Sequence, residues 1–143
     1  GLDRAAMRRL VFADPSAKAR LEGILHPLIG QLAAERCQSA PTPYVILAVP
    51  LLIESGTYRA RCDRIVVVDC PESLQVERVM SRSGIGRDEV LAIMAAQASR
   101  AERLAVADDV VLNDGERAKI DPQVRTIHQK YLRLSAEKVK AGC

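Results

Sequence analysis

Arginines cluster between two predicted strands, with a spacing that suits binding of an anion. Residues four or three apart on a helix project from the same side, so neighbouring arginines can act in pairs. Guanidinium groups recognise phosphate oxygens through paired N–H donors. Gly84 and Gly86 separate the pairs and supply a natural hinge, so this segment could close over a phosphate group. The arginines are Arg78, Arg82, Arg87, Arg100 and Arg103.

A solvated helix surface is the alternative interpretation of these arginines. Acidic residues stand close to them along the chain and could pair with them in water, as exposed charges on helices commonly do. Spacing alone therefore leaves both interpretations open. The acidic residues are Glu77, Asp88, Glu89 and Glu102.

An apolar segment with one carboxylate, Pro50-Leu51-Leu52-Ile53-Glu54, directly follows the first predicted strand. Such a wall could line a pocket for a bulky organic ligand, although ordinary core packing explains it equally well. His26 precedes Pro27 in a helical pattern, and a histidine can act as acid, base or phosphate contact. No neighbouring Asp or Ser suggests a catalytic triad, so a structural role for His26 is favoured.

Three β-prone segments must position these groups. Residues 44–49 and 64–69 are apolar almost throughout, which is typical of strands buried on both faces of a parallel sheet. Residues 109–112 predict a short third strand, followed by a turn at 113–115. In open α/β sheets ligands collect at the carboxyl ends of strands, so the segments just after these strands are the first candidates for a site.

Helices are expected between and around the strands. Asp3 and Asp14-Pro15 predict two helix starts, and Pro27 predicts a bend or break at His26. Ser99 to Glu102 matches a capping box, which places Arg100 at a helix start. Further helices are predicted over about 73–82 and 88–97. A last helix, capped by Asp121-Pro122, should bury Val124, Ile127, Tyr131 and Leu134.

Composition argues against several classes of function. The net charge of +3 and the pI near 8.8 suit an anionic ligand but fall short of a dedicated nucleic-acid binder. Aromatic side chains that could stack on bases are scarce, and no apolar run is long enough to cross a membrane. Cys37, Cys62, Cys70 and Cys143 form no C-x-x-C pair, which favours a reducing cytoplasm and no metal site.

Six segments in this order resemble the dephospho-CoA kinase family over almost the whole chain. The most specific is the run Q-A-S-R-A-E-R-L-A-V-A-D-D-V that leads into N-D-G. The six are L-D-R-A-A-M-R-R-L-V-F, I-L-H-P-L-I, V-P-L-L-I-E-S-G, V-V-V-D-C-P-E, A-A-Q-A-S-R-A-E-R-L and A-D-D-V-V-L-N-D-G.

The resemblance implies an α/β fold of the P-loop kinase type, with three layers in which helices flank a parallel sheet. It also implies transfer of the ATP γ-phosphate, with Mg²⁺ accompanying the nucleotide, to the ribose 3′-hydroxyl of dephospho-CoA. ATP and dephospho-CoA would be the partners, with no nucleic acid and no membrane; the sequence leaves the oligomeric state open. Residues 1–143 would form one domain, with a helical substrate region over about 1–40 and a lid over about 78–103.

Site residues follow from the same resemblance. Arg82, Arg100 and Arg103 would neutralise charge on the transferring phosphoryl group. Gln97 and Asn113 would lie beside the nucleotide. The dephospho-CoA side would be formed by His26, Pro27, Pro50, Leu51 and Leu52.

The chain also departs from the family pattern. The family begins with a strand and the loop G-x-x-G-x-G-K-[ST], whose amides cradle phosphates, and these residues contain no such loop. The first strand, the P-loop helix and a catalytic base are therefore expected to be missing from this sequence, because Gly1-Leu2-Asp3 opens in a mid-family helix. Ala48 stands where many relatives carry an acid near magnesium, so we assign no metal ligand.

Two other functions stay open at this stage. The chain could be a noncatalytic module that binds a CoA-like ligand or a partner protein, which the missing phosphate loop favours. It could also belong to a P-loop kinase with another acceptor, because that fold hosts many substrates. By itself, this chain is expected to be inactive as a kinase.

Overall fold

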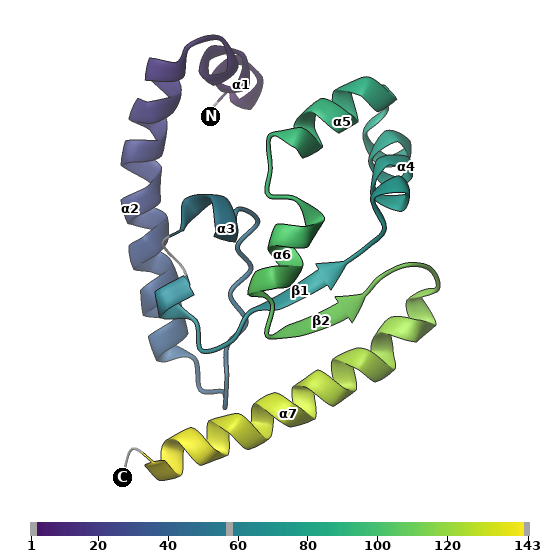
Figure 1. Ribbon diagram of the computed structural model, residues 1–143. Coiled ribbons are helices and arrows are strands. Elements are labelled where there is room, and N and C mark those ends of the chain that lie inside the picture. The colour runs from purple at the N-terminus through teal and green to yellow at the C-terminus, as the bar shows by residue number, and fades with distance from the viewer. Residues whose placement is uncertain (1–2, 57–58, 142–143) are drawn as a thin grey trace. The chain divides into compact units, whose positions relative to one another are not determined.

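The computed structural model describes residues 3–56 and 59–141 (Figure 1). Contacts divide the chain into two compact units, residues 1–47 and residues 48–143, and we describe each by itself. This division does not test whether the units fold independently, so the single domain expected from the sequence stays a prediction. Cys143 lies outside the described residues.

The first unit consists of helix α1 (Arg4–Ala13) and helix α2 (Pro15–Ser39), as the two start signals predict. The Asp3 carboxylate accepts a hydrogen bond from the backbone N–H of Ala6 at 2.9 Å. Asp14 caps α2 in the same way, through the N–H of Ser16 at 2.8 Å. Each aspartate satisfies a backbone donor that a helix start leaves without an intrahelical acceptor.

Pro27 does not break α2, which runs from Pro15 to Ser39 with Pro27 inside it, and the bend expected at His26 stays a prediction. A proline in a helix interior removes one hydrogen bond, here the bond to the carbonyl of Gly23. Gly23 is exposed, so water can reach that carbonyl, and the turns on both sides keep the helix intact.

The strand predicted over residues 44–49 is also wrong. The segment is irregular, and Val45, Ile46 and Leu47 are exposed rather than buried. An extended backbone becomes a strand only when its N–H and C=O groups pair with a neighbouring strand. Within residues 3–56 and 59–141 the only strand pairing is between two strands later in the chain, so the apolar run finds no partner.

The second unit alternates strands with helices. Its two strands are β1 (Val66–Asp69) and β2 (Asp109–Leu112), both where the sequence predicts them. Its helices are α3 (Leu52–Ser55), α4 (Glu72–Ser83), α5 (Arg87–Ala95), α6 (Arg100–Val106) and α7 (Ile120–Ala141), with short 3₁₀ turns at Arg59–Arg61 and Arg117–Lys119.

Strands β1 and β2 pair in parallel, with Val66 opposite Asp109 and Asp69 opposite Leu112. The parallel α/β arrangement is therefore confirmed, but the described sheet has two strands and not three. Because paired residues of parallel strands point to the same face, Asp69 lies on the face of Val110, and Asp109 lies on the opposite face.

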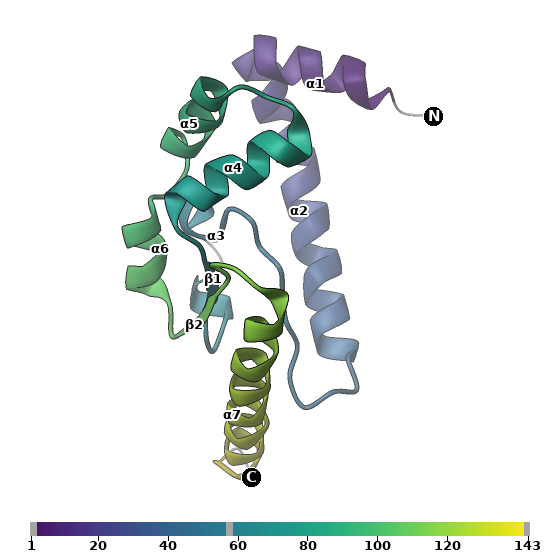
Figure 2. The ribbon, with the colours of Figure 1, turned by 90° about the vertical axis from the view of Figure 1, so that its right-hand side faces the viewer.

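Helices cover both faces of this strand pair. Arg100 of α6 binds Asp69 on one face, and Lys130 of α7 binds Asp109 on the other. Figures 1 and 2 show α6 and α7 on opposite sides of the strands. The buried apolar side chains of the second unit are Ile65, Cys70, Val76, Val90 and Val111.

The turn residues between helices behave as the sequence predicts. Gly84 ends α4 with a φ of 67°, and its N–H donates to the carbonyl of Met80 at 2.9 Å. Glycine adopts this left-handed conformation without steric cost. The capping box at the start of α6 is confirmed, because Ser99 and Glu102 each bind the other's backbone N–H.

The last helix differs from its prediction. It begins at Ile120, so Asp121 lies in its first turn rather than capping it. Ile127 and Tyr131 are half-buried, but Val124 and Leu134 are exposed. Only part of the apolar stripe contacts β2, since a strand of four residues is much shorter than a helix of 22.

Each face of the sheet is left partly uncovered. Val68 is 63% exposed and Val110 is 43% exposed, which is unusual for valines in strands. None of the helices in the described ranges combines the length and apolar character that a membrane crossing requires.

Candidate functional site

The carboxyl ends of β1 and β2 meet at one edge of the sheet. Asp69 is the last residue of β1, and Asn113 follows the last residue of β2. The Asn113 N–H donates to the carbonyl of Asp69 at 2.7 Å, which holds the two ends together. This is the edge at which the sequence predicts a ligand.

Asp69 and Arg100 form a bidentate ion pair at this edge. Arg100 donates from Nε to Oδ1 and from Nη2 to Oδ2 of Asp69, both at 2.7 Å. The Asp69 side chain is only 7% exposed, whereas that of Arg100 is 42% exposed. The capping box explains why Arg100 can reach Asp69, because it fixes the first turn of α6.

The pair stabilises both charges. The hydrogen bonds from the Arg100 guanidinium hold the pKa of Asp69 below its ordinary value, against the opposing effect of burial. In return, the hydrogen bonds to Asp69 raise the pKa of Arg100 above its ordinary value. Asp69 is therefore ionised at neutral pH although its side chain is buried.

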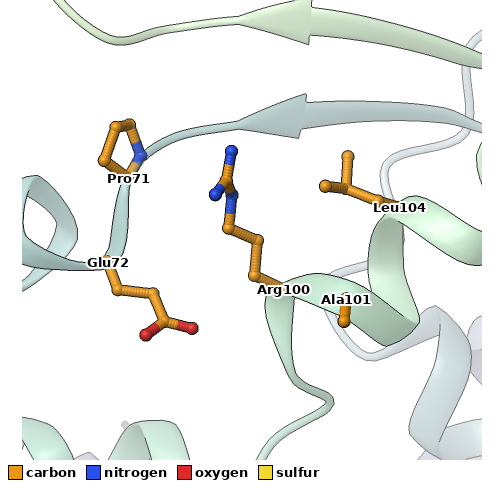
Figure 3. Close-up of a pocket in the computed structure, with 5 residues that line it drawn as sticks. All are labelled: Pro71, Glu72, Arg100, Ala101 and Leu104. Carbon is orange, nitrogen blue, oxygen red and sulfur yellow. The ribbon is translucent and has the colours of Figure 1, made fainter.

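A depression of about 430 Å³ lies beside Arg100. Figure 3 shows the Arg100 side chain extending from the start of α6 toward the end of β1, with Pro71 and Leu104 on either side. The Glu72 carboxylate and Ala101 complete the lining. The depression therefore combines one arginine, one carboxylate and a small apolar wall.

Arg78 fixes the turn that follows β2. Its Nη1 donates to the carbonyl of Asn113 at 2.9 Å and lies 3.5 Å from the Sγ of Cys70. Gln75, one turn earlier on α4, donates to the carbonyl of Cys70 at 2.6 Å. Helix α4 thus positions the backbone after both strands.

Glu54 connects the apolar segment after residue 49 with the start of α6. Its Oε1 accepts a hydrogen bond from the Ala98 N–H at 2.8 Å. That bond is the main reason why the pKa of Glu54 lies below its ordinary value. A second depression, of about 280 Å³, lies nearby and includes Leu52, Ile53 and Ile65 in its lining.

The structure gathers only some of the residues predicted for the site. Arg100 and Asn113 both contact Asp69, and Arg103 lies one turn further along α6. Arg82 lies exposed in the last turn of α4, about 15 Å along the helix from its start near Pro71, so it belongs to the far end of that helix.

The other predicted residues lie elsewhere. Gln97 is exposed in the turn between α5 and α6, and Pro50 and Leu51 are exposed ahead of α3, with Leu52 half-buried. His26 and Pro27 are exposed on α2 in the first unit. His26 and Pro27 belong to the first unit and the other three residues to the second, so the grouping of these five residues into one dephospho-CoA surface stays a prediction.

No metal-binding group can be assigned in the described part of the chain. There, no three His, Cys, Asp or Glu side chains lie close enough together to hold an ion. Cys37, Cys62 and Cys70 are free thiols.

Sequence reasoning included the segment Asp69-Cys70-Pro71, at the end of the second predicted strand, among the candidate positions but assigned Asp69 no role, although one signal was present. It is a carboxylate at the end of an otherwise apolar strand, where burial is expected and where an unpaired charge is costly. Such a position calls for a cationic partner, and an arginine at the next capped helix start could have been proposed.

Comparison with known proteins gives one consistent family. The model of the family described as dephospho-CoA kinase matches residues 1–119. A dephospho-CoA kinase from Dechloromonas aromatica is 72% identical over 142 residues, which cover 99% of this chain and 69% of that protein. Another, from Thiobacillus denitrificans, is 53% identical over 138 residues, which cover 96% of this chain and 68% of that protein.

Solved structures agree with this result. A crystal structure of a protein from Thermus thermophilus matches with a TM-score of 0.76 and 36% identity, over 90% of this chain and 67% of that one. A dephospho-CoA kinase from Campylobacter jejuni matches with a TM-score of 0.68 and 25% identity, over 92% of this chain and 66% of that one.

Proposed function

Since this chain belongs to the dephospho-CoA kinase family, we propose that its protein transfers the γ-phosphoryl group of ATP to the ribose 3′-hydroxyl of dephospho-CoA. The observation that carries the proposal is the 72% identity over 142 residues to a dephospho-CoA kinase. The Asp69–Arg100 pair supports it, because an oriented guanidinium at the carboxyl edge of a parallel sheet suits a phosphate ligand.

The arginines of α6 would act by electrostatics. Phosphoryl transfer needs mainly positioning and neutralisation of charge on the phosphoryl oxygens. Arg100 and Arg103 are one turn apart on one helix, so both can approach the same anion. We propose the same role for Arg82, which would require the end of α4 to move toward the nucleotide.

We propose the remaining roles on the family resemblance. Gln97 and Asn113 would contact the nucleotide, and Asn113 has its backbone fixed by Asp69 and Arg78. His26, Pro27, Pro50, Leu51 and Leu52 would contact dephospho-CoA.

Mg²⁺ would enter with ATP as part of the substrate complex. The described residues do not gather a set of carboxylates that fits the ion, and Ala48 offers no ligand. We therefore assign no step of the reaction to a metal held by residues of this chain. We keep the cytoplasm as the proposed location, which the free thiols at Cys37, Cys62 and Cys70 support.

The test is a kinase assay on the complete gene product, with chain 1–143 assayed in parallel. Each is incubated with ATP, Mg²⁺ and dephospho-CoA, and coenzyme A and ADP are measured by mass spectrometry. The proposal expects equal amounts of both products from the complete gene product. If that protein forms no coenzyme A, the proposal is wrong.

Two controls separate the rival functions. A nucleoside replaces dephospho-CoA as acceptor, and faster ADP formation with the nucleoside would favour a kinase with another acceptor. Calorimetry of chain 1–143 with dephospho-CoA tests the binding module. Micromolar binding by the chain, together with no turnover by the complete gene product, would favour that module.

A further inference from the structure

Asp69 is buried, and a single side chain, Arg100, donates to both of its oxygens. A carboxylate with so little exposure is stable only while a cation remains against it. Removal of Arg100 would leave that charge without its hydrogen-bonded cation. The pair is therefore expected to persist when a ligand arrives, and not to open to release Arg100.

Asp69 uses only part of the hydrogen-bonding capacity of Arg100. A guanidinium has five N–H donors, and Asp69 accepts one from Nε and one from Nη2. The donors on Nη1 and the second donor on Nη2 remain for another acceptor. Arg100 also lines the depression that Pro71, Ala101 and Leu104 help to form, so those donors can reach a ligand there.

The bidentate contact also fixes the plane of the guanidinium. A single hydrogen bond would leave the long side chain free to rotate, whereas two parallel bonds determine both direction and tilt. Asp69 is itself fixed, because it ends β1 and its carbonyl accepts the Asn113 N–H. The sheet therefore fixes the orientation of Asp69, and Asp69 in turn fixes the orientation of the Arg100 guanidinium.

We propose that Asp69 is the positioning residue that orients Arg100 toward a phosphate group of the nucleotide. This inference rests on the proposed kinase activity and deepens it, since it assigns a role to a residue that does not itself touch the substrate. It predicts that Asp69 acts on turnover only through Arg100.

The test is a double-mutant cycle on the complete gene product. The variants are Asp69→Asn, Arg100→Ala and the two together, and kcat and KM for ATP are measured for each. We expect Asp69→Asn to lower kcat by about tenfold, because misplacement of a catalytic group by about 1 Å has effects of this order or larger. We expect Arg100→Ala to lower kcat by about 100-fold, and the double variant to match it.

A matched control is Asp63→Asn. Asp63 also pairs with a cation, Lys138, but their side chains are 79% and 71% exposed, and Asp63 precedes the amino end of β1 rather than lying at the carboxyl ends. This variant should keep the wild-type kcat. Asp69→Glu serves as the conservative variant, because it keeps the charge and should recover part of the turnover that Asp69→Asn loses.

Thermal melting of each variant keeps the result interpretable. If Asp69→Asn stays folded and keeps the wild-type kcat while Arg100→Ala lowers it, the inference is overturned and the kinase proposal stands. The inference is also overturned if Asp69→Asn lowers kcat further in the Arg100→Ala background. If Asp69→Asn does not fold, the kcat of Asp69→Glu, alone and in the Arg100→Ala background, is judged by the same two criteria. If the wild-type protein makes no coenzyme A, the proposed function itself has failed.

Discussion

At the amino ends of β1 and β2, one carboxylate is surrounded by donors, whereas at the carboxyl ends one carboxylate meets a single arginine. Asp109 accepts from Arg64 Nε at 2.8 Å, from the Tyr131 hydroxyl at 3.0 Å, and from Lys130. Its side chain is 8% exposed, almost the same as that of Asp69. Burial therefore does not distinguish the two ends.

The two ends differ in whether the cations keep N–H donors available for a ligand. Arg64 also donates to the carbonyl of Asp108, so the amino-end groups bind one another and the backbone. Lys130 and Tyr131 belong to α7, so this network fastens that helix to the sheet. Arg100, in contrast, keeps donors beside a depression. We interpret the amino end as a stabilising network and the carboxyl end as the functional edge.

Electrostatics agrees with this division. Burial alone would raise the pKa of Asp109, but the hydrogen bonds from Arg64, Lys130 and Tyr131 outweigh it and lower that pKa to about 2. Burial and the bond to Asp109 raise the pKa of Tyr131 to about 12. Both groups therefore keep one ionisation state over the whole physiological range.

The largest expected effect is on stability, at the amino end. Asp109→Asn should lower the free energy of unfolding by about 3 kcal/mol, because it leaves Arg64 and Lys130 without their shared carboxylate. Urea denaturation at neutral pH measures this loss. The variant should keep its kcat at a temperature where it is folded, and a lower kcat would break the division between the two ends.

The next effect is on turnover, at the carboxyl end. Arg103→Ala in the complete gene product should lower kcat by roughly 100-fold and change KM for ATP much less, because the lost charge matters most in the transition state. Arg59→Ala is the matched control, since Arg59 pairs with Asp108 at the amino end. Equal losses of kcat in the two variants would contradict the comparison.

Acid should weaken the amino-end network in a predictable direction. The pKa of Asp109 is about 2 in the folded chain and near its ordinary value of 3.8 when unfolded. A lowered folded pKa contributes stability above the unfolded value, and this contribution is lost as pH falls through the folded value. Between about pH 5 and pH 2, the free energy of unfolding of the wild type should fall by about 2 kcal/mol more than that of Asp109→Asn. Urea denaturation across this pH range measures it, and parallel curves would argue against the assignment.

The smallest effect should come from the backbone support at the carboxyl end. Arg78→Ala removes the hydrogen bond to the carbonyl of Asn113 and should raise KM for ATP about fivefold, which corresponds to about 1 kcal/mol, the net contribution of one hydrogen bond. Steady-state kinetics of the complete gene product tests this. A change in kcat without a change in KM would place Arg78 closer to the chemistry than the turn after β2.

Local signals in the sequence predicted the local structure well. The Asp14-Pro15 start, the capping box at Ser99 and the two valine-rich strands are all present, because each depends on residues within a few positions of one another. The failures depend on distant partners. Residues 44–49 have strand-like composition, but composition cannot supply the neighbouring strand that a ladder needs.

The candidate site was predicted in part for the same reason. The capping box identified the start of α6, but only the fold could show that Arg100 binds Asp69. Asp69 stands 31 residues before Arg100, and no spacing rule relates the two. Pro27 does not end α2, because the surrounding turns of the helix tolerate one missing hydrogen bond.

The uncovered valines of the sheet also bear on how the isolated chain behaves in solution. Val68 lies on β1, whose second edge has no strand beside it in the described ranges, and Val110 exposes further apolar surface. Open strand edges next to apolar side chains favour pairing between molecules. Chain 1–143 handled by itself is therefore expected to self-associate as its concentration rises, and it should be kept dilute during purification.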